Sequence, residues 1–242
     1  MRVPTALAAF AVTAFIGRAA HAQNSWPLFH AVLATQRPLP CRETSHDAQS
    51  RRDEAAVMTF DHGRLATRTQ TVSGGTGSRV DTYQYNAQGL LVAEDYRDGG
   101  EIIHVEFTYD RQGRPVTREA RGLRQHLRIA FAYDQAGHLT RMDYDYDVNG
   151  TIDMVESLTY EGGRLAGFEQ RMGGRVQYTE RYFYEPGGRL QRMERDLAAN
   201  GSVDLRRGYF YDARGRLARE ENDRNADGAA EEVRTYRYDC GR

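Results

Sequence analysis

The chain has 242 residues, carries 33 basic against 34 acidic side chains, and has a formal net charge of −1. A chain without a basic excess is poorly suited to nonspecific nucleic-acid binding, so we expect no nucleic-acid partner. Every basic residue is arginine. The absence of lysine excludes chemistry that needs a lysine amine, such as Schiff-base formation.

The first 22 residues have the features of a secretory signal peptide. Arg2 supplies the positive charge of the N-terminal region, and residues 6–16 form an apolar run that is too short to span a bilayer. Residues 20–22 fit the small-x-small rule for a cleavage site. We therefore expect an exported protein, periplasmic or extracellular, whose mature chain begins at Gln23. No later apolar stretch approaches membrane length, so we expect no membrane span.

Residues 23–54 precede the repeated part of the chain, and we expect them to form an N-terminal cap and loop. The apolar residues between 26 and 33 could form one short amphipathic helix, which Pro38 would end. Residues 42–54 are polar and typical of a loop. Because the terminal units of a repeat array must be covered, this segment is expected to cap the first repeat.

The chain has two cysteines, Cys41 and Cys240, which lie on either side of the repeats. An exported chain meets oxidising conditions, and a disulfide between the two cysteines is one expectation. Two unpaired or intermolecular thiols are the alternative, because a bridge requires the two ends of the array to meet.

Residues 55–242 repeat at a fixed period that is anchored by an aromatic residue. Successive anchors are 24 to 27 residues apart, each follows an apolar-x-aromatic pattern, and each is followed by glycine three or four residues later. The anchors are Phe60, Tyr85, Tyr109, Tyr133, Tyr160, Tyr184, Tyr211 and Tyr238. Period-two alternation with aromatic residues is typical of half-buried strands, and Tyr-Asp-x-x-Gly is typical of a tight hairpin turn.

A second turn lies midway through each repeat, at sequences such as Asp98-Gly99, Asn149-Gly150 and Asp227-Gly228. Each repeat is therefore expected to be a two-stranded hairpin, which gives about fourteen to sixteen antiparallel strands in an all-β fold. Twisted open sheets rarely exceed ~10 strands. The sheet should consequently roll into a spiral or close on itself.

The repeated Tyr-Asp-x-x-Gly-Arg-Leu pattern, as at residues 211–217, resembles the YD-repeat (RHS-repeat) family over about residues 55–242. The resemblance implies a spiral β-sheet of hairpins that forms a hollow shell, and it permits carbohydrate binding. Toxin-associated members carry an Asp-Pro-x-Gly-Leu closing motif followed by a toxic domain. This sequence contains neither feature, so the resemblance does not imply that the chain encapsulates a toxin.

The three longer repeats contain candidate calcium loops. Residues 145–156 match the calcium loop of an EF-hand, with oxygen ligands expected from the side chains of Asp145, Asp147, Asn149, Asp153 and Glu156 and from the carbonyl of Thr151. A second, partial copy offers Asp223, Asn225, Asp227 and Glu231, and Arg234 occupies its last position. A third copy, residues 196–204, lacks one ligand at Ala198. Since Asn-Gly and Asp-Gly turns form without metal, calcium-free hairpin turns are the alternative.

The sequence carries few signals of an enzyme. The histidines lack metal-ligand spacing, no nucleophile or phosphate-binding motif is present, and the acidic residues are periodic, so no catalytic residue can be named. We expect an exported binding or structural module with a carbohydrate or protein ligand and candidate calcium sites, and no enzyme. A polysaccharide-acting enzyme and an accessory partner of a secreted toxin system are the alternatives.

Overall fold

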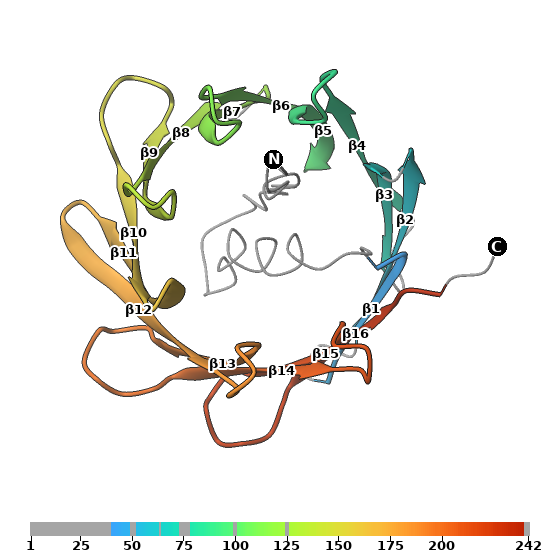
Figure 1. Cartoon of the computed structure of the whole chain (residues 1–242), viewed down its shortest axis with the longest axis vertical. Coiled ribbons are helices and arrows are strands. Elements are labelled where there is room, and N and C mark those ends of the chain that lie inside the picture. The colour runs from blue at the N-terminus through green and yellow to red at the C-terminus, as the bar shows by residue number, and fades with distance from the viewer. Residues whose placement is uncertain are drawn as a thin grey trace, which may run out of the picture. The chain divides into compact units, whose positions relative to one another are not determined.

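The computed structural model of the chain describes residues 40–48, 52–62, 64–72, 78–98, 101–123 and 126–239. These residues form strands and turns and contain no helix (Figure 1). The strands are β1 (Arg42–Asp47), β2 (Arg52–Asp61), β3 (Arg64–Val72), β4 (Ser78–Tyr85), β5 (Leu91–Asp98), β6 (Glu101–Tyr109), β7 (Pro115–Arg121), β8 (His126–Tyr133), β9 (Leu139–Tyr146), β10 (Met154–Glu161), β11 (Arg164–Met172), β12 (Arg175–Tyr184), β13 (Leu190–Asp196), β14 (Leu205–Tyr211), β15 (Leu217–Asp223) and β16 (Glu232–Arg237).

Several sequence predictions fall outside the described residues. They are the signal peptide at 1–22, the predicted cap helix within residues 23–39, and Cys240. These remain predictions. In the described part of the chain, no helix is both long and apolar enough to cross a bilayer.

The strands pair with their neighbours along the chain, and β1 lies between β16 and β2 in the hydrogen-bond order. The sheet is therefore a closed antiparallel barrel of sixteen strands. Of the two forms that the repeats allowed, a spiral and a closed sheet, the closed sheet is confirmed. The hairpin array predicted from the tyrosine period is confirmed as well.

Strand β1 closes this order, and it corrects the prediction of a loop over residues 42–54. The Cys41 amide donates to the Arg237 carbonyl at 2.9 Å, and the Met58 amide donates to the Cys41 carbonyl at 3.0 Å. A polar segment can complete a sheet because the hydrogen bonds between strands are made by backbone groups and do not depend on which side chains the strand carries. Cys41 thus pairs with Arg237, which lies three positions before Cys240 in the sequence, and Cys240 itself lies outside the described residues. The bridge itself remains a prediction.

Seven of the eight anchor residues lie at a β-bulge, and the eighth, Tyr238, follows the end of β16. In every Tyr-Asp hairpin the register shifts by one residue immediately before the anchor, for example between Thr159 and Tyr160 and between Phe183 and Tyr184. A bulge bends its strand and increases the local right-handed twist. Bulges at a regular period therefore add curvature in the same sense at each repeat, which favours closure of the sheet.

The anchor tyrosines also join one repeat to the repeat before it. The Tyr184 hydroxyl donates to the Leu165 carbonyl at 2.8 Å, and the Tyr211 hydroxyl donates to the Leu190 carbonyl at 2.8 Å. Tyr85, Tyr109 and Tyr160 make the same contact with Leu65, Leu91 and Leu139. Burial raises the pKa of Tyr160 and Tyr211 to about 12, which keeps these hydroxyls protonated as donors.

The turns after Tyr85, Tyr109, Tyr133 and Tyr211 are closed by the Asn or Asp side chain at their start, which accepts a backbone amide four residues later. The Asp110 carboxylate accepts the amides of Gln112 and Arg114, each at 2.9 Å, and the Arg114 guanidinium at 2.7 Å. Gly113 has a φ of +77°, a conformation that side chains disfavour. The turn chemistry predicted from Tyr-Asp-x-x-Gly is confirmed.

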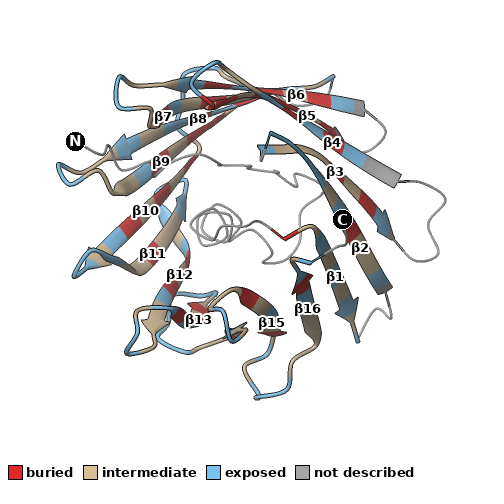
Figure 2. Ribbon diagram, turned by 45° about the vertical axis from the view of Figure 1, so that its right-hand side comes forward, coloured by how far each residue is buried: buried red, intermediate tan, exposed pale blue. Residues whose placement is uncertain are grey.

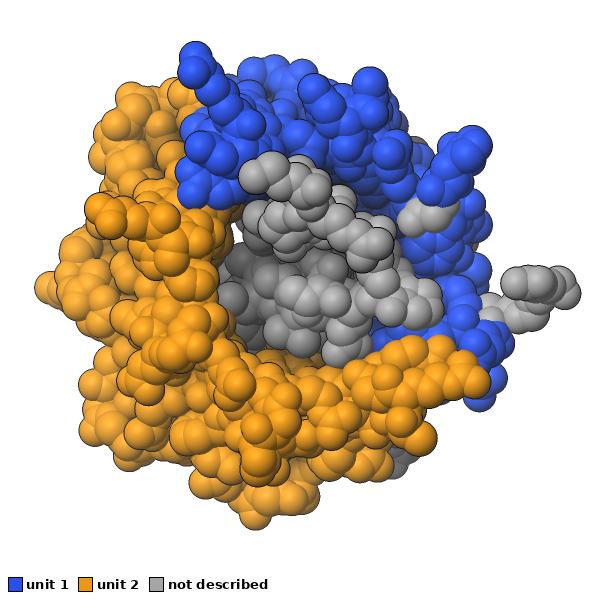
Figure 3. Space-filling model, in the orientation of Figure 1, with its two compact units in different colours: residues 1–44, 53–126, 236–242 blue, residues 45–52, 127–235 orange. Residues whose placement is uncertain are grey.

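The chain forms two compact units, which Figure 3 colours separately: residues 1–44, 53–126 and 236–242, and residues 45–52 and 127–235. In the first unit, one face of β4–β7 buries Tyr83, Tyr96, Ile103, Val105 and Phe107. In the second, the buried face of β9–β15 contains Met142, Leu158, Phe168, Met193 and Leu217. Buried and exposed residues alternate along the strands, as Figure 2 shows.

We predict that Tyr184→Phe lowers the free energy of unfolding by about 1 kcal/mol, because the change removes one hydroxyl donor and leaves the ring in place. Tyr211→Phe should have a similar effect, since its contact is equivalent. Urea denaturation at constant pH measures both. Unchanged stability in both variants would show that the anchor hydroxyls do not contribute to the fold.

Candidate calcium-binding loops

The three predicted loops lie on one edge of the sheet within the second unit. They connect β9 to β10, β13 to β14 and β15 to β16. Because successive antiparallel strands reverse direction, connections from odd-numbered to even-numbered strands all fall on the same edge, and the Tyr-Asp turns fall on the other. We call the edge with the three loops the long-loop edge.

The Asp145 loop is organised by its first carboxylate. Asp145 accepts the amides of Asn149 at 3.0 Å and Gly150 at 2.9 Å, and the Asp153 carboxylate accepts the Tyr146 amide at 2.7 Å. Asp147 has a φ of +70°. Acids at the first and ninth positions are thus held at the mouth of the loop, although their hydrogen bonds also stabilise a turn without metal.

The Asp196 loop repeats this design with fewer ligands. Asp196 accepts the amides of Asn200 at 3.0 Å and Gly201 at 2.6 Å, and Asp204 accepts the Leu197 amide at 2.7 Å. Partial desolvation opposes ionisation, but the amide hydrogen bonds from Gly201 and Asn200 hold the pKa of Asp196 below its ordinary value. The loop is a well-formed acidic turn, and Ala198 offers no oxygen at the third position.

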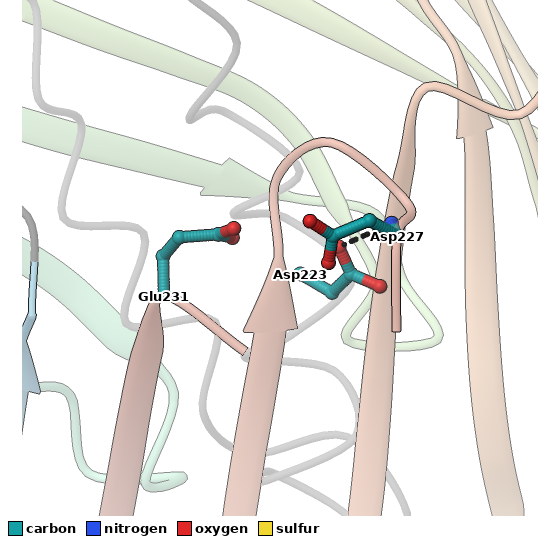
Figure 4. A group of neighbouring side chains, drawn as sticks. All are labelled: Asp223, Asp227 and Glu231. Atoms are coloured by element: carbon teal, nitrogen blue, oxygen red, sulfur yellow. Dashed lines mark hydrogen bonds between the residues drawn. The ribbon is translucent and has the colours of Figure 1, made fainter. Parts of the chain in front are cut away.

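The Asp223 loop brings its acids closest together. Ligand oxygens of Asp223, Asp227 and Glu231 all lie within 4.8 Å of one another, and in Figure 4 the three side chains gather at one end of the hairpin. Among the described residues no other set of three acidic, histidine or cysteine side chains meets this spacing. Asn225 lies beside them, and its side-chain amide donates to Asp227 at 2.9 Å.

The structure and the sequence therefore favour different loops as the best candidate calcium site. The sequence favours the Asp145 loop because its pattern is complete, whereas the structure assembles three acids only in the Asp223 loop of the described chain. Asn149 replaces the fifth-position acid in the Asp145 loop, and the Asn149 side chain accepts the Thr151 amide at 2.8 Å. The carbonyl of Thr151 remains a predicted ligand.

Glu156 corrects the predicted ligand set. It is buried on β10, where its carboxylate accepts the Tyr144 hydroxyl at 2.6 Å and the Gln170 amide at 2.9 Å. In an EF-hand the twelfth residue lies on a helix that follows the loop, but here a strand follows it. Strand alternation instead places Glu156 on the buried face with Met154 and Leu158.

A buried polar row around Glu156, in the second unit, is not predicted by the sequence pattern. Gln170 also contacts the Tyr178 hydroxyl at 3.4 Å, Arg195 lies 4.4 Å from the Tyr178 ring centroid, and Arg195 donates to Glu180 at 2.8 Å. Glu156 and Glu180 both lie four residues before an anchor tyrosine. At that position three other repeats have the apolar residues Ala56, Val105 and Ile129, and three have the charged residues Asp81, Arg207 and Arg234. A charged residue at that repeat position was the available signal.

Comparisons with known proteins give a likeness of fold. The sequence matches no family model and no curated protein. A porin-like protein from Bacteroides uniformis ATCC 8492 is similar with a TM-score of 0.58 and 12% identity, over 81% of this chain and 96% of that chain. At this identity the likeness concerns the fold alone.

Components of Tc toxins are more distantly similar. The TcdB2-TccC3-Cdc42 structure gives a TM-score of 0.36 and 17% identity, over 70% of this chain and 8% of that chain. The Tc holotoxin pore of Photorhabdus luminescens gives a TM-score of 0.33 and 16% identity, over 77% of this chain and 12% of that chain. Both likenesses are too weak to carry an argument. The class of protein is therefore defined by the strand pairing alone: a closed antiparallel barrel built from hairpins.

We predict that Glu156 makes the protein less stable as the pH rises. Burial is the main cause that raises the pKa of Glu156 to about 7, and Glu180 adds to it, while hydrogen bonds from Tyr144 and Gln170 oppose it. Since the folded pKa lies above the ordinary value of 4.5, the folded form is favoured most below pH 4.5. That stabilisation is lost progressively as the pH rises through 7.

Glu156→Gln should therefore raise the free energy of unfolding at pH 8 by at most about 3 kcal/mol and change it little at pH 4. Urea denaturation across this pH range measures the difference. Glu169→Gln, on the exposed face of β11, is the matched control and should leave the pH dependence unchanged. If Glu156→Gln changes the free energy of unfolding by the same amount at every pH, the raised pKa of Glu156 is contradicted.

Proposed function

We propose that this chain is an exported repeat protein of the YD-repeat type that acts as a binding or structural module, with calcium held in its long-loop edge. The observation that carries the proposal is the shared design of the three loops, above all the close approach of Asp223, Asp227 and Glu231. The repeated Tyr-Asp turns support the family assignment, whereas the closed sheet differs from the spiral that the resemblance implies. The predicted signal peptide supports export.

Calcium suits the loops because it takes six to eight oxygen ligands in a flexible geometry. The Asp223 loop would supply Asp223, Asn225, Asp227 and Glu231. Carboxylates held within a few ångströms repel each other, and a divalent cation would relieve that repulsion. A carboxylate oxygen that accepts one amide hydrogen keeps a lone pair for a metal, so the loop hydrogen bonds are compatible with binding.

In the Asp145 loop, Asp145, Asp147, Asn149, Asp153 and the Thr151 carbonyl would provide the oxygens. Asp145 and Asp153 are already oriented by their hydrogen bonds to loop amides. Glu156 is left out of this set because it is committed to Tyr144 and Gln170. The Asp196 loop, with Ala198 in the third position, would bind most weakly.

A binding or structural role is favoured over an enzyme by the placement of the buried acids. Glu156 and Glu180 occupy the same position of successive repeats and are engaged by Tyr144, Gln170 and Arg195. Groups that are tied into a buried row are better suited to holding the sheet than to contacting a substrate. Hydrolysis of a polysaccharide by the purified protein would contradict this part of the proposal.

The proposal predicts that millimolar calcium raises the melting temperature relative to excess chelator, because an ion that binds only the folded state stabilises it by mass action. Asp223→Asn with Asp227→Asn should remove part of the calcium-dependent increase. Asp145→Asn with Asp147→Asn should remove another part. Asparagine retains a hydrogen-bond acceptor in the loop while removing the charge that calcium needs.

Asp196→Asn is the matched control, since it makes the same change at the first position of the weakest loop, and it should leave the increase nearly intact. The quantity compared is the calcium-dependent difference in melting temperature for each variant, so any loss of intrinsic stability cancels. Equal melting temperatures with calcium and with chelator in the unmodified protein would show that the loops are metal-free turns.

A further inference from the structure

Strand β1 differs from the other strands in how little its side chains are buried. Its residues alternate between exposed and half-buried, and none of them is buried. Each of the other strands contributes at least one buried residue, such as Ala56 on β2 and Tyr236 on β16, the two neighbours of β1. Because the burial of apolar surface is the main favourable term in folding, β1 gains little stability from this source.

Backbone hydrogen bonds hold β1 in the sheet. In the first unit, the Cys41 amide donates to the Arg237 carbonyl at 2.9 Å, and the Met58 amide donates to the Cys41 carbonyl at 3.0 Å. In the second unit, the Ala48 amide donates to the Glu231 carbonyl at 2.8 Å. These bonds use main-chain groups alone, so a strand from another chain can make them equally well.

A cluster of charged side chains fixes β1 in the second unit. The Arg224 guanidinium lies 2.9 Å from the carboxylate of Asp47 on β1 and 3.0 Å from that of Glu232 on β16. The three side chains are only 13 to 25% exposed, so water screens their attraction less than that of a surface pair. Ser45 of β1 also donates to Glu232, at 3.2 Å. We call Asp47, Arg224 and Glu232 the Arg224 clamp.

Glu43 gives β1 a contact of the same kind in the first unit. Its carboxylate lies 3.4 Å from the guanidinium of Arg68, which is buried on β3. Residues 43, 45 and 47 share one face of β1, because side chains alternate along a strand. The strand that fits this place therefore carries an acid, a hydroxyl and an acid at alternate positions, and a second copy of this chain carries that order.

We propose that the place of β1 is an interaction site for a second copy of this chain, which inserts its own residues 42–48 between β16 and β2. Each copy then supplies β1 to the other, and the product is an exchanged dimer. Exchange of an identical element is a low-cost route to a dimer, because every contact of the single chain is made again. This inference goes beyond the proposed function and does not require calcium.

Local opening of β1 is the step that allows the exchange. Segments with few buried apolar contacts open at a lower free energy than the core of a sheet. Once β1 leaves, β2 and β16 present unpaired amides and carbonyls, which are a template for another strand. The chain has a formal net charge of only −1, so two copies repel each other weakly.

The predicted bridge between Cys41 and Cys240 bears on the exchange. A bridge within one chain would tie the residue before β1 to the chain that follows β16, and it would oppose opening. The experiment therefore uses mature protein with Cys41→Ser and Cys240→Ser, in which the strand contacts act alone. Serine at position 41 keeps a donor for the Arg237 carbonyl, which the Cys41 thiol contacts at 3.4 Å.

The test reverses the charges of the Arg224 clamp in two separate variants, with excess chelator present. Asp47→Arg brings two arginines together in a single chain, and Arg224→Asp brings three acids together. In an exchanged dimer of one copy of each variant, the new arginine of the first copy meets the new aspartate of the second. The unchanged Asp47 of the second copy meets the unchanged Arg224 of the first, so both clamps are complete.

The two variants are mixed in mild urea, diluted and separated by size-exclusion chromatography with light scattering. An affinity tag on one variant and recovery of the untagged variant measure the mixed dimer. The dimer fraction should be about tenfold higher in the mixture than in either variant alone, because only the mixed dimer has both clamps. Asp47→Arg with Arg224→Asp in the same chain restores the clamp internally and should be as monomeric as the protein without these changes.

Arg219→Glu mixed with Glu221→Arg is the matched control. These residues form an exposed ion pair at 3.2 Å on β15, and both stay in the same copy after exchange. Mixing them should not raise the dimer fraction. Circular dichroism checks that each sample is folded. A clamp mixture that is no more dimeric than its separate variants overturns the proposal, and so does an equal rise in the control mixture.

The outcomes separate this inference from the proposed function. A mixed dimer in chelator, together with no effect of calcium on melting, would support the exchange and contradict the calcium sites. A calcium-dependent rise in melting temperature without a mixed dimer would overturn the exchange and leave the calcium sites standing.

Discussion

The fold depends on the bulge at seven of the eight anchor residues and on the hydroxyl contact of the anchor tyrosines. The bulge bends the strand, and the tyrosine hydroxyl joins the bent strand to the preceding repeat through a main-chain carbonyl, as Tyr184 does with Leu165. Since the bulge recurs in every Tyr-Asp hairpin, curvature accumulates in one sense along the chain. A sheet with this many strands must curl, and regular bulges turn that tendency into closure.

The repeated part of the fold could be predicted because its signals are local. The alternation before Tyr109, the turn from Asp110 to Gly113 and the glycine with positive φ all act within a few residues. Closure could not be predicted in the same way. It depends on pairing between β1 and β16, with Cys41 and Arg237 separated by 196 residues, and β1 lacks the apolar alternation that marks a strand.

In the loops, too, the features set by nearby residues could be predicted and the contacts with other strands could not. The spacing of Asp223, Asn225, Asp227 and Glu231 identified a group of residues that the turn does bring together. Glu156 was assigned to the Asp145 loop because the pattern assumes a helix after the loop, whereas strand alternation turns its side chain onto the buried face. Its partner Gln170 lies on the next strand, and the sequence alone gives no sign of that contact.

The second unit thus combines two features in one part of the sheet. A buried polar row that includes Glu156, Glu180 and Arg195 supports it on one face, and the acidic loops form one edge. Arg206 on β14 donates to the Ala226 carbonyl of the Asp223 loop, which joins that loop to the neighbouring hairpin.

Calorimetric titration of calcium into the metal-free mature protein is the direct test of the calcium loops. We predict a saturable heat with an ion bound at each of the Asp145 and Asp223 loops, and loss of binding at the Asp223 loop in the double variant Asp223→Asn with Asp227→Asn. A flat titration of the folded protein at millimolar calcium would show that neither loop binds the ion.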